Sequence, residues 1–116
     1  MGDWRCAGRF TDRNREIEWK IVSEGGTGTK AEIEFYSNPD WGKGFDVVVH
    51  NECFANTANP EYIRRITAAH KAGVHAVVIH CAMHTYRAAA FDDWRNLLGV
   101  TSRRHEHKSQ YPVKLE

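Results

Sequence analysis

Residues 47–53 read Val-Val-Val-His-Asn-Glu-Cys, and residues 77–84 read Val-Val-Ile-His-Cys-Ala-Met-His. Each segment is a short apolar run that ends in polar His and Cys side chains, and the two lie about 30 residues apart, which is the size of a βαβ unit. In such a unit the strands run parallel and end at the same edge of the sheet. Ligands of open α/β sheets bind at that carboxyl edge. The two segments therefore predict one polar crevice that combines His, Cys and Glu side chains.

A helix is expected between the two apolar runs. Asn59 is a suitable N-cap residue, and Pro60 suits the first position of a helix. Gly73 provides a C-cap immediately before the second run. Because residues 45–49 and 74–79 are almost continuously apolar, they predict parallel strands that are covered on both faces.

Outside this unit the sequence predicts fewer regular elements. Residues 1–16 are polar and predict little regular structure, whereas residues 17–22 are compatible with a strand or with the end of a helix. Residues 31–36 alternate with period two, which predicts a strand with one exposed face. An apolar stripe predicts a helix over 88–98, and a proline favours an extended conformation for 105–115. The expected sheet contains parallel strands near 33–36, 45–50 and 74–80.

The amino-acid composition limits the classes of protein to which this chain can belong. A chain of 116 residues with 41% hydrophobic residues forms one domain with a real core, and a net charge of +1 provides no long-range attraction for nucleic acid or an acidic membrane. No apolar run is long enough to span a bilayer, and the first twenty residues are too charged for a secretory signal. Three cysteines without paired spacing predict no disulfide framework and favour a reducing compartment. We therefore expect a cytoplasmic protein that binds neither nucleic acid nor a membrane.

Histidines at two ligand-like spacings indicate a candidate metal site. His80 and His84 are four residues apart, so they share one face if a helix begins just after the second strand. His105 and His107 share a face if they lie on a strand. Four imidazoles would suit a divalent metal such as Zn²⁺. The alternative is that the first pair hydrogen-bonds neighbouring loops and the second pair is exposed.

Cys81 lies where the second strand is expected to turn into a helix, which is a suitable place for a nucleophile. Amide groups at a helix N-terminus stabilise an oxyanion and lower the pKa of a thiol. The glycines of a nucleophile elbow are missing, however, and a buried structural cysteine is the alternative. Cys53 leaves the same two alternatives open.

Polar side chains also follow the first strand directly. Asn51 and Glu52 suit hydroxyl recognition and acid/base chemistry, and Glu52 is also a candidate carboxylate ligand for the metal. Helix or loop capping explains both residues equally well. Tyr86 and Arg87 follow the second strand and would suit a site for a sugar or an acid.

Three segments in this order resemble ThuA-like proteins, the trehalose-utilisation family. They are residues 45–55, residues 76–87, and residues 94–99 taken together with His105. The motif-bearing core spans about 31–113 of a single domain, 1–116. The resemblance implies a flavodoxin-like, class I glutamine amidotransferase-like fold, which is a three-layer α/β sandwich with a parallel sheet. It also implies a role in the metabolism of trehalose or related, including oxidised, disaccharides.

The chain departs from that family in two ways. Cys81 occupies the position of the amidotransferase nucleophile, but its flanking glycines and the later His and Glu are missing, so glutaminase activity is not expected. Family members are longer, so the expected fold is incomplete. Half of a doubly wound sheet leaves an apolar face uncovered. We therefore expect a marginally stable chain or a homo-oligomer.

Two hypotheses for function follow. One is an enzyme of hydrolase or isomerase type that acts on a small-molecule sugar, and the other is a non-catalytic sugar-binding, metal-binding or interaction module with the same fold. The candidate catalytic residues are His80, His84, Glu52 and Cys81. The candidate substrate-binding residues are His50, Asn51, Tyr86 and Arg87. The candidate metal ligands are His80, His84, His105 and His107. We expect His50 or Asn51 to approach His80 or Cys81 in the shared crevice.

Overall fold

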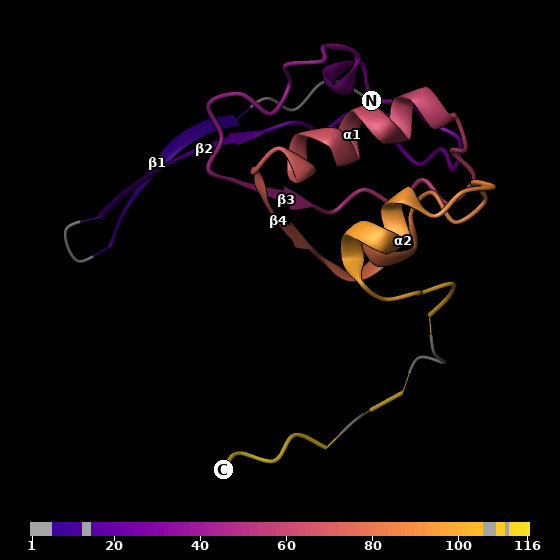
Figure 1. Cartoon of the computed structure of the whole chain (residues 1–116). Coiled ribbons are helices and arrows are strands. Elements are labelled where there is room, and N and C mark those ends of the chain that lie inside the picture. The colour runs from indigo at the N-terminus through magenta and orange to yellow at the C-terminus, as the bar shows by residue number, and fades with distance from the viewer. Residues whose placement is uncertain (1–5, 13–14, 106–108, 111) are drawn as a thin grey trace.

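The computed structural model describes residues 6–12, 15–105, 109–110 and 112–116. Its strands and helices are β1 (Cys6–Asp12), β2 (Arg15–Ile21), β3 (Val47–His50), α1 (Pro60–Lys71), β4 (His75–Val78) and α2 (Asp93–Leu98), together with the 3₁₀ helices η1 (Glu34–Ser37) and η2 (His80–His84). Figure 1 shows β1 and β2 projecting from a body that contains β3, β4 and the two α-helices. No helix in the described part of the chain combines the length and the apolar character needed to cross a bilayer.

The predicted βαβ unit is formed by β3, α1 and β4. The two strands pair in parallel, from Val47 opposite His75 to His50 opposite Val78. The side chain of Asn59 accepts a hydrogen bond from the backbone N–H of Glu61 at 3.1 Å, so it caps α1 as expected. Because the strands are parallel, both end at the same edge of the sheet, and the prediction of a common carboxyl edge is confirmed.

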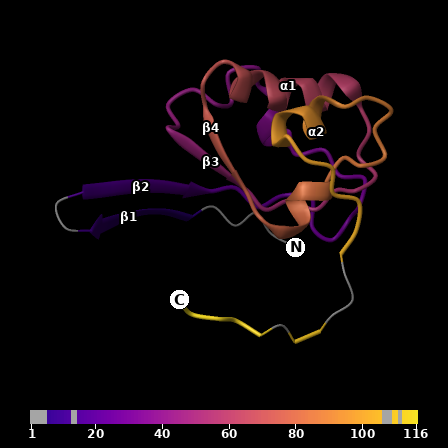
Figure 2. The ribbon, with the colours of Figure 1, turned by 60° about the horizontal axis from the view of Figure 1, so that its bottom comes forward.

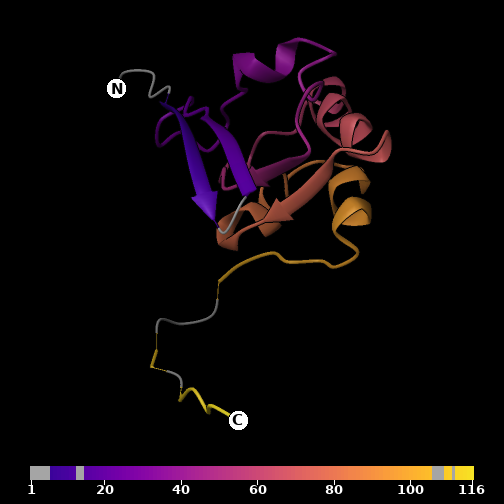
Figure 3. The ribbon, with the colours of Figure 1, turned by 90° about the vertical axis from the view of Figure 1, so that its left-hand side faces the viewer.

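The helices lie on one side of the β3–β4 sheet (Figure 3), and α2 packs against α1 (Figure 2). Ile63 and Ile66 of α1 are fully buried, and Trp94 of α2 is 4% exposed. These side chains belong to one core cluster. The described residues therefore form a mixed α/β fold with a small parallel sheet and two helices.

The other face of this sheet is open to solvent, so the expectation of strands covered on both faces is wrong. The outward-facing apolar side chains are each 44–57% exposed. They are Val47, Val49, Val77 and Ile79. The reason is that both helices lie on the opposite face, while side chains along a strand alternate between the two faces. Self-association through this face stays a prediction.

Residues 31–36 do not form the expected strand. The chain makes the 3₁₀ turn η1 instead, in which the backbone N–H of Tyr36 donates to the carbonyl of Ile33 at 3.1 Å. Ile33 and Tyr36 are both buried, and residues three apart lie on the same face of a 3₁₀ helix. Packing of this pair against the core therefore overrides the alternating pattern.

Two further expectations for local structure are corrected. The region 1–16 contains β1, which pairs antiparallel with β2 from Cys6 opposite Ile21 to Asp12 opposite Arg15. Its backbone hydrogen bonds come from the partner strand, which the polar sequence does not reveal. The helix expected over 88–98 begins only at Asp93, because the N–H of Ala88 bonds to the loop after β3 instead. The described residues between 105 and 116 include no helix or strand, as expected for an extended segment.

Candidate metal centre

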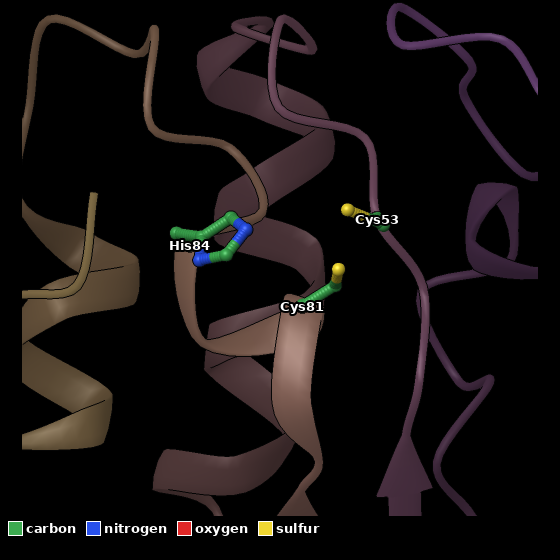
Figure 4. A group of neighbouring side chains, drawn as sticks. All are labelled: Cys53, Cys81 and His84. Atoms are coloured by element: carbon green, nitrogen blue, oxygen red, sulfur yellow. The ribbon is translucent and has the colours of Figure 1, made fainter. Parts of the chain in front are cut away.

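The loops after β3 and β4 meet through sulfur and nitrogen atoms. One ligand atom each from Cys53, Cys81 and His84 lies within 4.8 Å of the others. Cys53 follows β3, whereas Cys81 and His84 belong to η2, and Figure 4 shows the His84 ring beside the two cysteine side chains. The strand ends therefore converge as parallel pairing requires, although Cys53 makes the approach rather than His50 or Asn51.

The geometry of η2 explains which side chains come together. The expectation for His80 and His84 assumes an α-helical turn, in which residues four apart share a face. The chain forms a 3₁₀ turn instead, in which residues three apart eclipse, and this arrangement places Cys81 and His84 on one side. The indole N–H of Trp94 donates to the carbonyl of Ala82 at 3.0 Å and holds the turn against the core.

A second group of ligand atoms shares Cys81 with the first. His80, Cys81 and His105 also offer atoms within 4.8 Å of one another. The His105 Nε2 atom lies 2.8 Å from the Cys81 Sγ atom. The His105 ring centroid lies 4.5 Å from the ring centroids of both His80 and His84. His107, the fourth expected ligand, lies outside the described residues.

His84 is the buried member of the centre. Burial lowers the pKa of its imidazole, and the nearby His105, Arg87 and His80 lower it further, so the ring is neutral near pH 7. Its Nδ1 atom lies 3.4 Å from the hydroxyl oxygen of Ser102, and its Nε2 atom makes no hydrogen bond with the described residues. Neutral imidazole is the form that binds a metal ion.

Cys53 differs in exposure and protonation. Its side chain is exposed, and partial burial together with the adjacent Cys81 thiol raises its pKa. A metal ion would have to displace the thiol proton in order to bind the sulfur. The sequence is compatible with either a functional or a structural role for Cys53. The structure places its sulfur within 4.8 Å of the ligand atoms of Cys81 and His84.

His50 lies in the core rather than in the crevice. It is 0% exposed, and its Nδ1 atom lies 2.9 Å from the Oε1 atom of Glu52. Its Nε2 atom lies 2.7 Å from the Nε2 atom of His70, and the Nδ1 atom of His70 lies 2.7 Å from the carbonyl oxygen of Val74. A continuous chain of hydrogen bonds therefore runs from a backbone carbonyl through two imidazoles to a carboxylate.

The partners at each end of this chain indicate which ring nitrogens donate. The carbonyl of Val74 requires a proton on the Nδ1 atom of His70, and the ionised Glu52 requires one on the Nδ1 atom of His50. A third proton must lie between the two Nε2 atoms. Burial lowers the pKa of His70, which disfavours the charged form of that ring.

Glu52 is already engaged within this network. Burial by itself raises its pKa, but the hydrogen bond and the charge of His50 outweigh burial and lower it. The hydroxyl of Tyr86 donates to the Oε1 atom at 3.0 Å, and that of Tyr36 donates to the same atom at 3.4 Å. Burial raises the pKa of both tyrosines, which keeps them protonated as donors. The structure therefore places Glu52 with the core histidines, outside both groups of metal-ligating atoms.

The remaining predicted residues are spread around the centre. Asn51 and His80 are exposed, and exposed Arg87 donates a hydrogen bond to the carbonyl of Arg103. Tyr86 is buried and takes a positive φ of 58°, while His80 takes a φ of 50°. Residues other than glycine rarely adopt this left-handed conformation, and such strain is frequent at functional sites.

Sequence reasoning missed three contributors, which are Ser102, His70 and Tyr36. Of these, His70 had a readable signal, because it lies four residues after Ile66 on the apolar face of α1. A histidine on such a face needs a buried polar partner. Ser102 and Tyr36 carry no comparable local signal, because their partners lie 18 and 14 residues away along the chain.

Two cavities bear on ligand binding. The first is lined in part by His84 and Trp94 and has a volume of about 10 Å³, enough for a single water molecule. The second is an open groove of about 560 Å³ beside the end of α2. Polar side chains of Asp92, Asn96 and Arg103 line this groove. Its volume falls in the range of about 300–1,000 Å³ that is typical of small-molecule sites.

The chain was also compared with known proteins. No protein-family model, no curated protein and no solved structure matches it. The ThuA-like resemblance therefore stays a prediction from three segments of this sequence, and the site is argued from its own geometry.

Proposed function

We propose that this chain is a zinc-binding α/β domain whose metal ion is held at the carboxyl edge of β3 and β4. The ligands are Cys53, Cys81 and His84. The observation that carries the proposal is that their three ligand atoms lie within 4.8 Å of one another, although the residues come from two separate strand ends. Thiolate and imidazole together are the donor set that Zn²⁺ prefers.

This group is favoured over the group that contains His80. His84 is 5% exposed, whereas His80 and His105 are both exposed. Ser102 contacts the Nδ1 atom of His84, and metal-binding histidines are usually oriented in this way through their second ring nitrogen. A buried, oriented imidazole loses less freedom on binding a metal ion than an exposed ring does.

The distances are compatible with a tetrahedral ion. Zn–S bonds of about 2.3 Å and Zn–N bonds of about 2.0–2.1 Å separate the ligand atoms of a tetrahedron by about 3.3–3.8 Å. Since the separations are at most 4.8 Å, the three atoms need to close by at most about 1.2 Å. Cys53 is exposed and can rotate to achieve this. Three protein ligands leave a fourth position for water or a substrate hydroxyl.

For the wider role, we propose a ThuA-like protein that acts on trehalose or a related, including oxidised, disaccharide. The three sequence segments support this role, and so does the groove beside α2, because Asp92, Asn96 and Arg103 can hydrogen-bond sugar hydroxyls. A metal ion with an open position would polarise a hydroxyl or a bound water molecule. Flavodoxin-like topology and homo-oligomerisation belong to the same proposal.

The second candidate is a metal-binding module without catalysis. The cavity lined by His84 has a volume of only about 10 Å³, and this observation favours the second candidate. A sugar could then reach the metal only if the surrounding loops moved. The two candidates share the metal centre and differ in whether a sugar changes the coordination of the ion.

Metal binding is tested by titrating the metal-free protein with Zn²⁺ in a calorimeter and by recording the absorption of the Co²⁺-loaded protein. We expect one ion per chain and a thiolate-to-cobalt charge-transfer band. Cys53→Ser, Cys81→Ser and His84→Ala should each weaken binding by on the order of 100-fold or more, because each removes a ligand. His75→Ala is the matched control, since His75 is an exposed histidine on β4. Equal affinity in the control and the three variants would overturn the proposal.

The wider role is tested on the same Co²⁺-loaded protein. Trehalose and its oxidised derivatives are added while the cobalt spectrum and product formation are followed. A spectral change with turnover supports the sugar enzyme. An unchanged spectrum without turnover supports the non-catalytic module.

A further inference from the structure

Cys53 and Cys81 occupy matched positions after the two parallel strands. His50 and Val78 are the last paired residues of β3 and β4, and each cysteine lies three residues beyond its own member of this pair. Figure 4 shows the two cysteine side chains near each other at the ends of these strands. The ligand atoms of the two cysteines lie within 4.8 Å of each other, and both thiols are free.

The two thiols have different surroundings. The Sγ atom of Cys81 lies 2.8 Å from the Nε2 atom of His105. A cysteine and a histidine in hydrogen-bonding contact form the arrangement that activates a thiol as a nucleophile. Among the described residues Cys53 makes no hydrogen bond to an imidazole, and its side chain is exposed. One thiol is therefore arranged for attack, and the other is accessible beside it.

We propose that Cys81 and Cys53 form a thiol–disulfide exchange pair that reacts with low-molecular-weight disulfides. Cys81 is the attacking thiol, His105 is its base, and Cys53 resolves the mixed disulfide. The inference rests on the placement of the thiols and does not require the proposed metal. It adds a redox reaction at an edge that also offers metal ligands.

The reaction balances in two steps. In the first, His105 takes the proton of Cys81, and the thiolate attacks one sulfur of the small disulfide. A bond forms between Cys81 and that sulfur, and the other half leaves as a thiolate that takes the proton from His105. In the second step, Cys53 attacks the Cys81 sulfur and expels the remaining small thiol, which leaves with the proton of Cys53. Two protein thiols are oxidised by two electrons, and one small disulfide is reduced to two thiols.

The test uses the full chain in the presence of a chelator, with oxidised glutathione as the probe. Peptide mapping by mass spectrometry should show a Cys53–Cys81 cross-link, with return to two thiols after addition of reduced glutathione. Cys53→Ser should stop the reaction with glutathione attached to Cys81, because no resolving thiol is present. Cys81→Ser should react at least tenfold more slowly, and His105→Ala should slow the first step by a similar factor without changing the product. His75→Ala is the control and should behave as the unaltered chain.

Three outcomes would overturn the inference. They are the absence of the cross-link, equally fast labelling of Cys53 in Cys81→Ser, and an unchanged rate in His105→Ala. His84→Ala separates this inference from the metal proposal, because it removes a metal ligand while the chain keeps both thiols and the imidazole of His105, although it also removes the ring that packs against His105. Cross-linking that persists in His84→Ala supports the inference whether or not the unaltered chain binds Zn²⁺.

Discussion

Two groups of histidines in this molecule differ in burial and in hydrogen bonding. His50 and His70 are buried, and their ring nitrogens are all engaged in hydrogen bonds with the core. The second group, at the carboxyl edge, combines His84 with exposed His80 and His105 and with two free thiols. Because the ring nitrogens of His50 and His70 are already hydrogen-bonded, neither ring has a nitrogen available to bind a ligand. The edge group keeps donor atoms available, so availability of donor atoms, rather than residue type, distinguishes the candidate site.

The largest loss of stability is expected when the hydrogen-bonded pair of His50 and His70 is broken. His50→Ala removes a fully buried ring and leaves the buried carboxylate of Glu52 without its hydrogen-bond partner, which should cost about 3–5 kcal/mol of unfolding free energy. Urea unfolding measures this loss. His75→Ala, at an exposed position, should stay within about 0.5 kcal/mol of the unaltered chain. If the two variants were equally stable, the assignment of His50 to a structural network would be wrong.

A comparison of two histidines of the same turn tests which members of the edge group bind the metal ion. His84→Ala should lower the affinity for Zn²⁺ by on the order of 100-fold, whereas His80→Ala should lower it by less than about tenfold. The reason is that the 3₁₀ turn groups His84, and not His80, with Cys81 and Cys53. Zinc titration by calorimetry measures both. The reverse order would favour the group formed by His80, Cys81 and His105.

Two tyrosines test how strongly the core network holds Glu52. Tyr86→Phe removes a donor that lies 3.0 Å from a buried carboxylate oxygen, and the expected loss of stability is about 1.5–3 kcal/mol. Tyr36→Phe removes a donor at 3.4 Å from the same atom and should cost less. Both variants keep the aromatic ring and therefore keep the packing. Equal and negligible losses in urea unfolding would indicate that Glu52 does not depend on these hydroxyls.

Acid should weaken the folded state through its buried histidines. Burial lowers the pKa of His70 and of His84 below the ordinary value of 6.5. The unfolded chain therefore binds more protons than the folded chain once the pH drops below 6.5. Stability is full above pH 6.5 and falls by up to about 1.4 kcal/mol per pH unit for each group as the pH approaches the folded-state pKa values. NMR titration of the metal-free protein measures both rings, and a midpoint above 6.5 for either would contradict this assignment.

The open face of the sheet gives the smallest expected effect on stability. Val49→Thr introduces a hydroxyl at an outward position that is 57% exposed, so the free energy of unfolding should change by no more than about 0.5 kcal/mol. Concentration-dependent association should decrease, because the exposed apolar surface becomes more polar. Light scattering over a range of concentrations checks this. Association that is unaffected by Val49→Thr would exclude this face as the contact.

Local signals in the sequence determined the central βαβ unit. Apolar runs, the cap at Asn59 and the proline at the start of α1 act over a few residues, and each predicts its element without knowledge of the rest of the chain. Parallel pairing then brings both strand ends to one edge, so the general location of the candidate site also followed from the sequence.

Only the tertiary structure decided which side chains at that edge are available. His50 precedes Cys53 by three residues, yet it is buried by contacts with His70 on α1, while Cys53 meets Cys81 across the strand ends. His105 reaches Cys81 from 24 residues away, which no local pattern encodes. Burial and hydrogen-bond saturation depend on partners that are distant in the chain. For this reason the residue types pointed to the edge, and packing selected the members of the site.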